Sequence, residues 1–61
     1  MTLNKITYSF KRARDGEAIS IEHVGPDGGI CRDALVYPDR VVGAVPEALV
    51  KVAREVLDTR V

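Results

Sequence analysis

The chain has few of the residues on which very small proteins often depend for stability. It contains one cysteine, one histidine, no tryptophan and only three aromatic residues in 61 positions. A single cysteine excludes an internal disulfide, and one cysteine with one histidine cannot provide the ligand set of a structural zinc site. Because a chain of this size buries only about 60% of its unfolded surface, the lack of such supports predicts a homo-oligomer, with a dimer as the expected form, or a complex with another protein partner.

A long apolar run and a net charge are also missing. The longest apolar stretch, VVGAV at residues 41–45, is too short to cross a bilayer, and MTLNKITYSF at the N-terminus lacks the apolar core of a signal peptide. We therefore expect no membrane association and a cytoplasmic location. The zero net charge conceals an asymmetry, because residues 1–14 carry four basic side chains and no acidic one. Such asymmetry favours nucleic-acid binding or pairing between copies, and chance in a short chain is the equal alternative.

What is present is a clear alternation of apolar and polar residues. It covers residues 3–13 and 17–24 and predicts two half-buried strands. Asp15-Gly16 between them is a strong signal for a two-residue hairpin turn. That turn brings all apolar residues of the two strands to one face. The predicted pairs are Phe10 with Ile21, Tyr8 with His23, and Arg14 with Glu17.

The glycine-rich segment GPDGG at residues 25–29 predicts a turn into a third strand over residues 30–37. The register of this strand has two alternatives. A five-residue loop pairs Glu22 with Arg32 but sets Ile21 against Asp33, whereas a four-residue loop sets Glu22 against Asp33. A β-bulge would reconcile the two.

The last third of the chain predicts a turn, a short strand and a helix. YPDR at residues 37–40 is the turn, Val41 and Val42 form the short strand, and Pro46 suits the first helical position. Residues with helical spacing form one apolar stripe: Leu49, Val52, Ala53, Val56 and Leu57. Charged residues lie opposite, and Arg54 is expected to reach Asp58.

These elements predict a single small domain over residues 1–61 of the α+β class. Its sheet has three to four antiparallel strands in a hairpin meander, with one C-terminal helix packed on one face. Since one helix covers one face, the other face of the first hairpin must meet water, a second subunit or a ligand. The candidate contacts to a protein partner or to nucleic acid are polar and basic residues near that face: Lys5, Thr7, Ser9, Lys11, Arg12 and Arg14.

His23 and Cys31 flank the glycine-rich turn, and a loop there could bring them close. A cysteine nucleophile also needs a thiolate-favouring setting, a group that orients the histidine and an oxyanion hole, and no motif provides them. GPDGG is not a phosphate-binding loop either, because strands flank it on both sides and it has no lysine. We predict no catalytic, cofactor-binding or metal-binding residues, and no enzyme.

Two segments resemble HicB-type antitoxins, which are small partners of RNase toxins. They are YSFKRARDGEAISIEH at residues 8–23 and PEALVKVAREVLD at residues 46–58, about half of the chain. The resemblance implies a hairpin-plus-helix fold and an antitoxin- or regulator-like role. YPDRVVGAVPE does not match the proline-glycine segment that such proteins place between sheet and helix.

The function predicted from the sequence is a small non-enzymatic protein-interaction module. It self-associates through the free sheet face or through an edge strand. The alternative is a small nucleic-acid-binding protein that uses the basic N-terminal strand.

Overall fold

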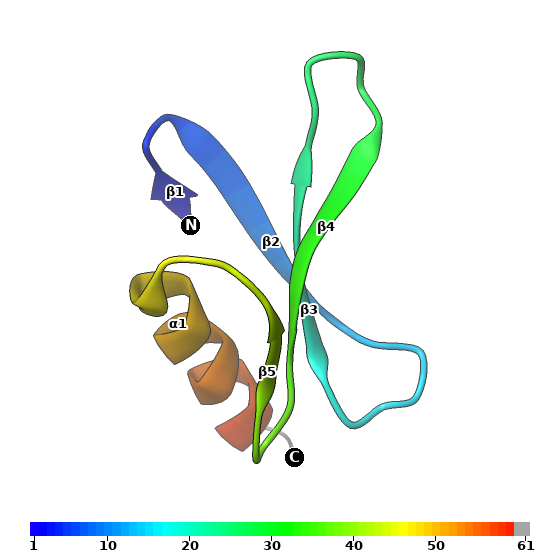
Figure 1. Cartoon of the computed structure of the whole chain (residues 1–61), viewed down its shortest axis with the longest axis vertical. Helices are drawn as coiled ribbons and strands as arrows, with labels where there is room; N and C mark the ends of the chain where they lie inside the picture. Colours follow the sequence, from blue (N-terminus) through cyan, green and yellow to red (C-terminus); the bar gives the residue numbers. More distant parts are fainter. Residues whose placement is uncertain (60–61) are drawn as a thin grey trace.

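The computed structural model describes residues 1–59 and contains one sheet and one helix (Figure 1). The sheet is antiparallel, and its five strands lie side by side in chain order. The predicted α+β class with a C-terminal helix is confirmed, but the predicted count of three to four strands is wrong. The elements are β1 Thr2–Leu3, β2 Ile6–Arg12, β3 Ile19–Val24, β4 Ile30–Val36, β5 Val41–Gly43 and α1 Glu47–Asp58.

The additional strand is β1, which the sequence prediction had joined to the beginning of β2. Asn4 and Lys5 both have positive φ, 53° and 67°, and they reverse the chain so that Leu3 pairs with Ile6. A turn of this kind is typical of hairpins in which asparagine adopts the left-handed conformation. Asn4 is therefore the residue from which this turn could be predicted. The alternating pattern on either side of it instead favoured one continuous strand.

The register between β2 and β3 is the predicted one. Phe10 pairs with Ile21 and Tyr8 with His23. The connection differs, because the Gly16 N–H donates to the Ala13 carbonyl and the loop spans residues 14–17. The Asp15 carboxylate accepts the Glu17 N–H at 2.9 Å, and the structure gives Arg14 and Glu17 no ion pair. The predicted pair between them is therefore wrong, since the loop is held instead by the bond from Gly16 to Ala13 and by the bond from Glu17 to the Asp15 carboxylate.

Both predicted registers between β3 and β4 occur, one on each side of a bulge. Ile21 pairs with Ala34, as a four-residue loop requires, whereas Glu22 pairs with Arg32, as a five-residue loop requires. The extra residue is Asp33, which has no partner in the register. The bulge thus keeps Ile21 opposite an apolar residue and Glu22 opposite a basic one. Neither residue is then set against Asp33, as each would be in one of the two uninterrupted registers.

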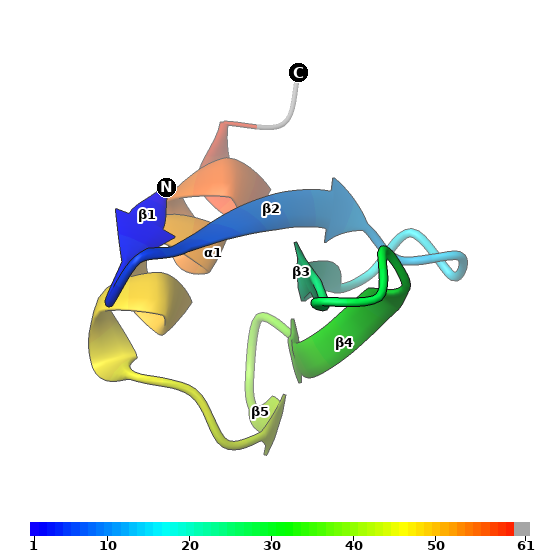
Figure 2. The same cartoon turned by 90° about the horizontal axis from the view of Figure 1, so that it is seen from above.

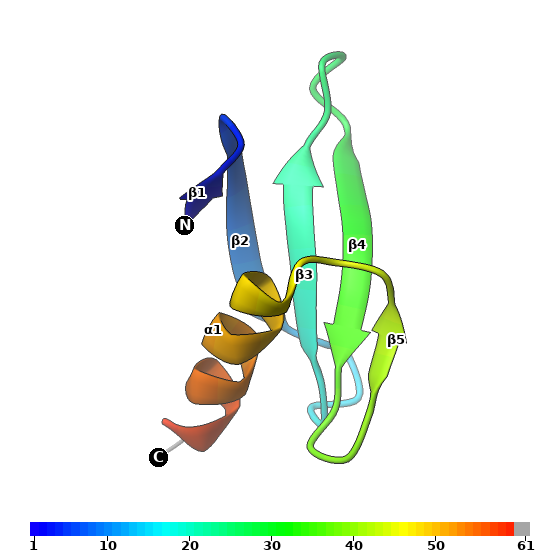
Figure 3. The same cartoon turned by 60° about the vertical axis from the view of Figure 1, so that its left-hand side comes forward.

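The core lies between α1 and one face of β3 and β4. Ile19, Ile21 and Val36 of the sheet and Leu49 of the helix are fully buried, and Figures 2 and 3 show the helix on one side of the sheet only. Tyr8 and Phe10 pack against this core, as the alternation predicted.

The helical stripe is largely the predicted one. Val50 packs against the core, and Val52 does not. Pro46 precedes the helix with a non-helical ψ of 145° and accepts the Leu49 N–H, so that it caps the helix instead of beginning it.

Gly43 at the end of β5 is required by its surroundings. Its φ is +109°, and a Cβ atom would lie 2.7 Å from the Asp33 carbonyl oxygen and 3.0 Å from the Ala34 Cα. Both contacts are with the backbone of β4 and cannot be relieved by rotating a side chain. The bulge at Asp33 and the glycine at position 43 are therefore fitted to each other.

Gly43→Ala should lower the free energy of unfolding by about 3 kcal/mol, because it adds backbone strain and a steric clash. Gly28→Ala is the matched control, since Gly28 has a φ of +86° and open space around it; it should cost about 1 kcal/mol. Urea denaturation followed by circular dichroism measures both. Equal losses for the two variants would show that the contact with β4 is unimportant.

Candidate interaction surface

The face of the sheet opposite α1 is lined by alternating residues of β2 to β5. One row across this open face consists of Lys11, Ser20, Leu35 and Val42, which are cross-strand neighbours. Ser20 is only 3% exposed and donates to the Glu22 carboxylate at 3.0 Å. Along this row the open face is polar over β2 and β3 and apolar over β4 and β5, while Arg32 of β4 lies farther along the same face, opposite Glu22.

The candidate residues of the basic N-terminal segment do not form one patch. Lys11 lies on the open face, whereas Arg12 alternates with it and donates to the Gly16 carbonyl at 3.1 Å. Lys5 lies in the β1–β2 turn at the other end of β2, and Arg14 lies in the loop after it. Thr7 and Ser9 share the face of Lys11, and their hydroxyls already contact Thr2 and the Glu22 carbonyl.

The bulge creates a polar cluster that the sequence did not reveal. The Asp33 carboxylate lies 2.7 Å from His23 Nδ1, and the Tyr8 ring meets the His23 ring edge-on with centroids 5.8 Å apart. Cys31 is the cross-strand neighbour of His23. Within residues 1–59 the cysteine sulfur makes no hydrogen bond to the imidazole, and no group of three acidic, histidine or cysteine side chains is placed to hold a metal ion.

This arrangement gives His23 an orienting carboxylate. The cluster also contributes to the fold. It connects β3 to the bulged residue of β4 through a bond between two side chains that are each about a quarter exposed.

Asp33→Ala should lower the free energy of unfolding by about 1 kcal/mol. The carboxylate is a charged acceptor, which strengthens the bond, and the partial exposure of both side chains reduces its contribution. A double-mutant cycle with His23→Ala, measured by urea denaturation, isolates this contact from other effects of the bulge. If Asp33→Ala costs as much in the His23→Ala background as in the parent, the contact does not stabilise the fold.

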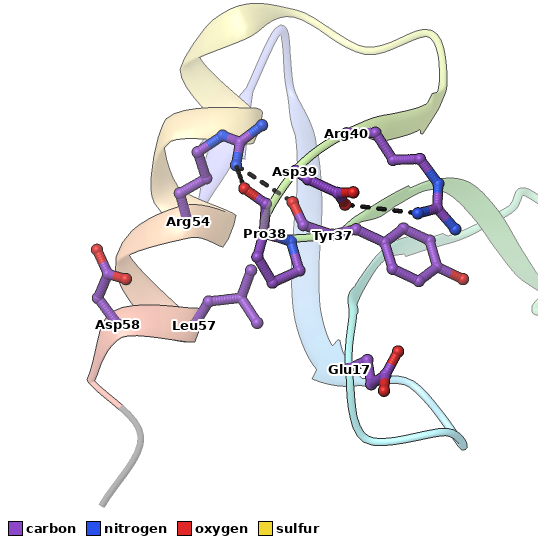
Figure 4. A pocket seen from close by; sticks show the side chains of 8 residues that line it. All are labelled: Glu17, Tyr37, Pro38, Asp39, Arg40, Arg54, Leu57 and Asp58. Carbon is purple, nitrogen blue, oxygen red and sulfur yellow. Dashed lines mark hydrogen bonds and ion pairs between the residues drawn. The ribbon is translucent and has the colours of Figure 1, made fainter.

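A hollow of about 700 Å³ lies where the β4–β5 turn meets the end of α1 (Figure 4). Arg54 donates from one guanidinium nitrogen to the Tyr37 and Pro38 carbonyls at 3.2 and 3.1 Å. The Arg40 guanidinium lies over the Tyr37 ring, 4.1 Å from its centroid. The expected contact of Arg54 with Asp58 is absent, because Arg54 reaches the carbonyls of the turn instead. Its bonds tie the helix to the turn that begins β5.

β5 is a free edge of the sheet. The Tyr37 N–H donates to the Arg40 carbonyl, and Leu35 pairs with Val42. Since peptide groups point alternately to the two sides of a strand, those of Val42 face β4. The Val41 N–H, the Val41 carbonyl and the Gly43 N–H then point away from the sheet. Figure 3 shows β5 at the end of the sheet beyond β4, with the segment after β5 crossing toward α1.

The edge carries no charge. Between Arg40 and Pro46 the sequence is VVGAV, and Val42 is 50% exposed. Proteins usually protect an exposed edge with lysine, proline or a bulge, and β5 has none of these within its span. The sequence had identified residues 41 and 42 as a strand but could not show on which side of the sheet it would lie.

Comparisons with known proteins do not identify a relative. No protein-family model matches the sequence, and neither the curated proteins nor the solved structures contain a match. The resemblance to HicB-type antitoxins therefore stays a prediction. In the described part of the chain, α1 is the one helix, and it is too short and too polar to span a bilayer.

Proposed function

We propose that the protein is a non-enzymatic interaction module that self-associates through the edge of β5. The observation that carries this proposal is the uncharged VVGAV segment, whose outward peptide groups lie beside an exposed valine. Unpaired peptide groups at a sheet edge are a ready template for a strand of another chain.

The opposite edge of the sheet is less suited to this role. β1 has two residues, and Met1 before it bonds to Tyr8 of β2: its carbonyl accepts the Tyr8 N–H, and its amino nitrogen donates to the Tyr8 carbonyl. The register pairs Thr2 with Thr7 and Leu3 with Ile6. Because Met1 bonds toward β2 and peptide directions alternate, only the peptide groups of Thr2 point to the outer side of β1. A strand added here would find fewer free peptide groups than one added beside β5.

The open face next to β5 also favours the β5 edge over the β1 edge as the site of self-association. Leu35 and Val42 are cross-strand neighbours there and form an apolar strip that α1 does not cover. When a strand is added beside β5, its side chains extend this strip and cover the outer flank of Val42. Burial of apolar area contributes about 25 cal/mol per Å² to the free energy of association. The charged part of the open face over β2 and β3 offers little apolar area to bury.

Val42→Lys should shift the protein from dimer to monomer in sedimentation velocity or light scattering at high micromolar concentration. A lysine on the edge leaves an ammonium group beside the second copy's apolar strip. Val24→Lys is the matched control, because Val24 is 65% exposed on the same face but lies on β3, away from β5. It should leave the dimer intact, and circular dichroism should show both variants folded.

A parent protein that is monomeric at these concentrations would contradict the proposal. So would a dimer that Val24→Lys disrupts and Val42→Lys does not, since the contact would then lie elsewhere on the open face.

Nucleic-acid binding through the basic segment is the alternative prediction, and it has its own test. If it holds, the double variant Lys11→Glu/Arg14→Glu should bind single-stranded and double-stranded oligonucleotides at least tenfold more weakly at low salt in a fluorescence anisotropy titration. Binding that is absent in the parent, or equal in parent and variant, would end this alternative.

A further inference from the structure

We infer that two copies pair through β5 in one register, antiparallel, with Val42 on the twofold axis. This inference rests on the proposed function and specifies its partner as a second copy of the chain. The two sheets would then join into one continuous sheet, with β5 of each copy at the centre.

The directions of the peptide groups are compatible with this register. Homodimers usually have twofold symmetry, and the same surface of both copies then forms the contact. An antiparallel strand pair with Val42 on the axis sets Val41 of one copy opposite Gly43 of the other. Two symmetric bonds follow from the outward groups, each from the Gly43 N–H of one copy to the Val41 carbonyl of the other.

The two neighbouring symmetric registers use the edge less well. One places Val41 on the axis and sets Val42 opposite Arg40 and Gly43 opposite Asp39, which belong to the turn before β5. The other places Gly43 on the axis and sets Val41 opposite Val45. β5 ends at Gly43, and Val45 packs against the core of its own copy. Its peptide group belongs to the segment that turns toward α1, so that this register would have to move the segment away from the core.

The side chains are compatible with the register that has Val42 on the axis. It sets Arg40 of each copy opposite Ala44 of the other, so that no two like charges oppose each other across the contact. On the open face, the two Val42 side chains meet, and Leu35 lies beside each of them. The strips of the two copies thus form one apolar row across the axis.

The register also predicts how near the two Val42 residues lie. They form a pair without hydrogen bonds between them, since the bonded pairs lie on either side. The Cα atoms of such pairs are about 4.5 Å apart, within the range that a disulfide bridges.

The experiment is disulfide cross-linking in a Cys31→Ser background, which removes the native thiol. Val42→Cys should give a covalent dimer on mild oxidation, seen by non-reducing electrophoresis and intact mass. Ala44→Cys in the same background should not cross-link with itself, because Arg40 opposes it. Val24→Cys, at a position on β3 that is more exposed than Val42 (65% against 50%), measures collisional cross-linking and should stay at least tenfold below Val42→Cys.

Two negative results have different meanings. If light scattering shows a dimer but Val42→Cys does not cross-link above the Val24→Cys level, the register is wrong while the self-association remains. Cross-linking of the double variant Val42→Cys/Ala44→Cys, in the absence of linking by either single variant, would identify the register with Gly43 on the axis and overturn this inference. If no dimer is found at any concentration tested, the proposed function fails first.

Discussion

A single helix can cover only one face of a sheet, and this constraint shapes the protein. The stabilising contact is the one between Leu49 and Ala53 of α1 and the apolar residues of β3 and β4, all fully or nearly fully buried. With no disulfide or metal site available from its composition, the chain depends on this one layer contact for its core. The open face and the edges of the sheet are what remains for contact with another molecule.

The irregular parts of the sheet support this arrangement. The bulge at Asp33 lets Ile21 face the core while Glu22 faces Arg32, and it brings Asp33 to His23. Gly43 fits against the bulged backbone, and Arg54 ties the preceding turn to the helix. Together these contacts hold β5 against β4 with its outer side free. The short edge strand is thus fixed by the core, although it contributes little to that core itself.

Periodic features were predictable from the sequence, because several residues of a strand or helix share the same spacing of apolar and polar side chains. The pairing of Phe10 with Ile21 follows from alternation alone, and the helix follows from the spacing of Leu49, Ala53 and Val56. Single positions were not predictable in this way. Asn4 reverses the chain through a left-handed conformation that few residues favour, and Pro46 lies one position outside the helix it was expected to begin.

The two alternatives for β4 show why the candidate surface could not be predicted completely. Each register was consistent with part of the pattern, and only the three-dimensional contacts reveal that both are used. The cluster of His23 and Asp33 depends on that choice, and so does the fit of Gly43 beside the bulge. The open edge depends on where β5 joins the sheet, which no residue of VVGAV indicates by itself.

Amide hydrogen exchange of β5, followed by NMR at low and high protein concentration, tests the central claim most directly. The account predicts that the Val41 and Gly43 amides become protected as concentration rises. The Val42 amide, already bonded to β4, and the Thr2 amide on the β1 edge should not change. Exchange at Val41 and Gly43 that stays fast and independent of concentration would contradict the claim that this edge binds a second copy.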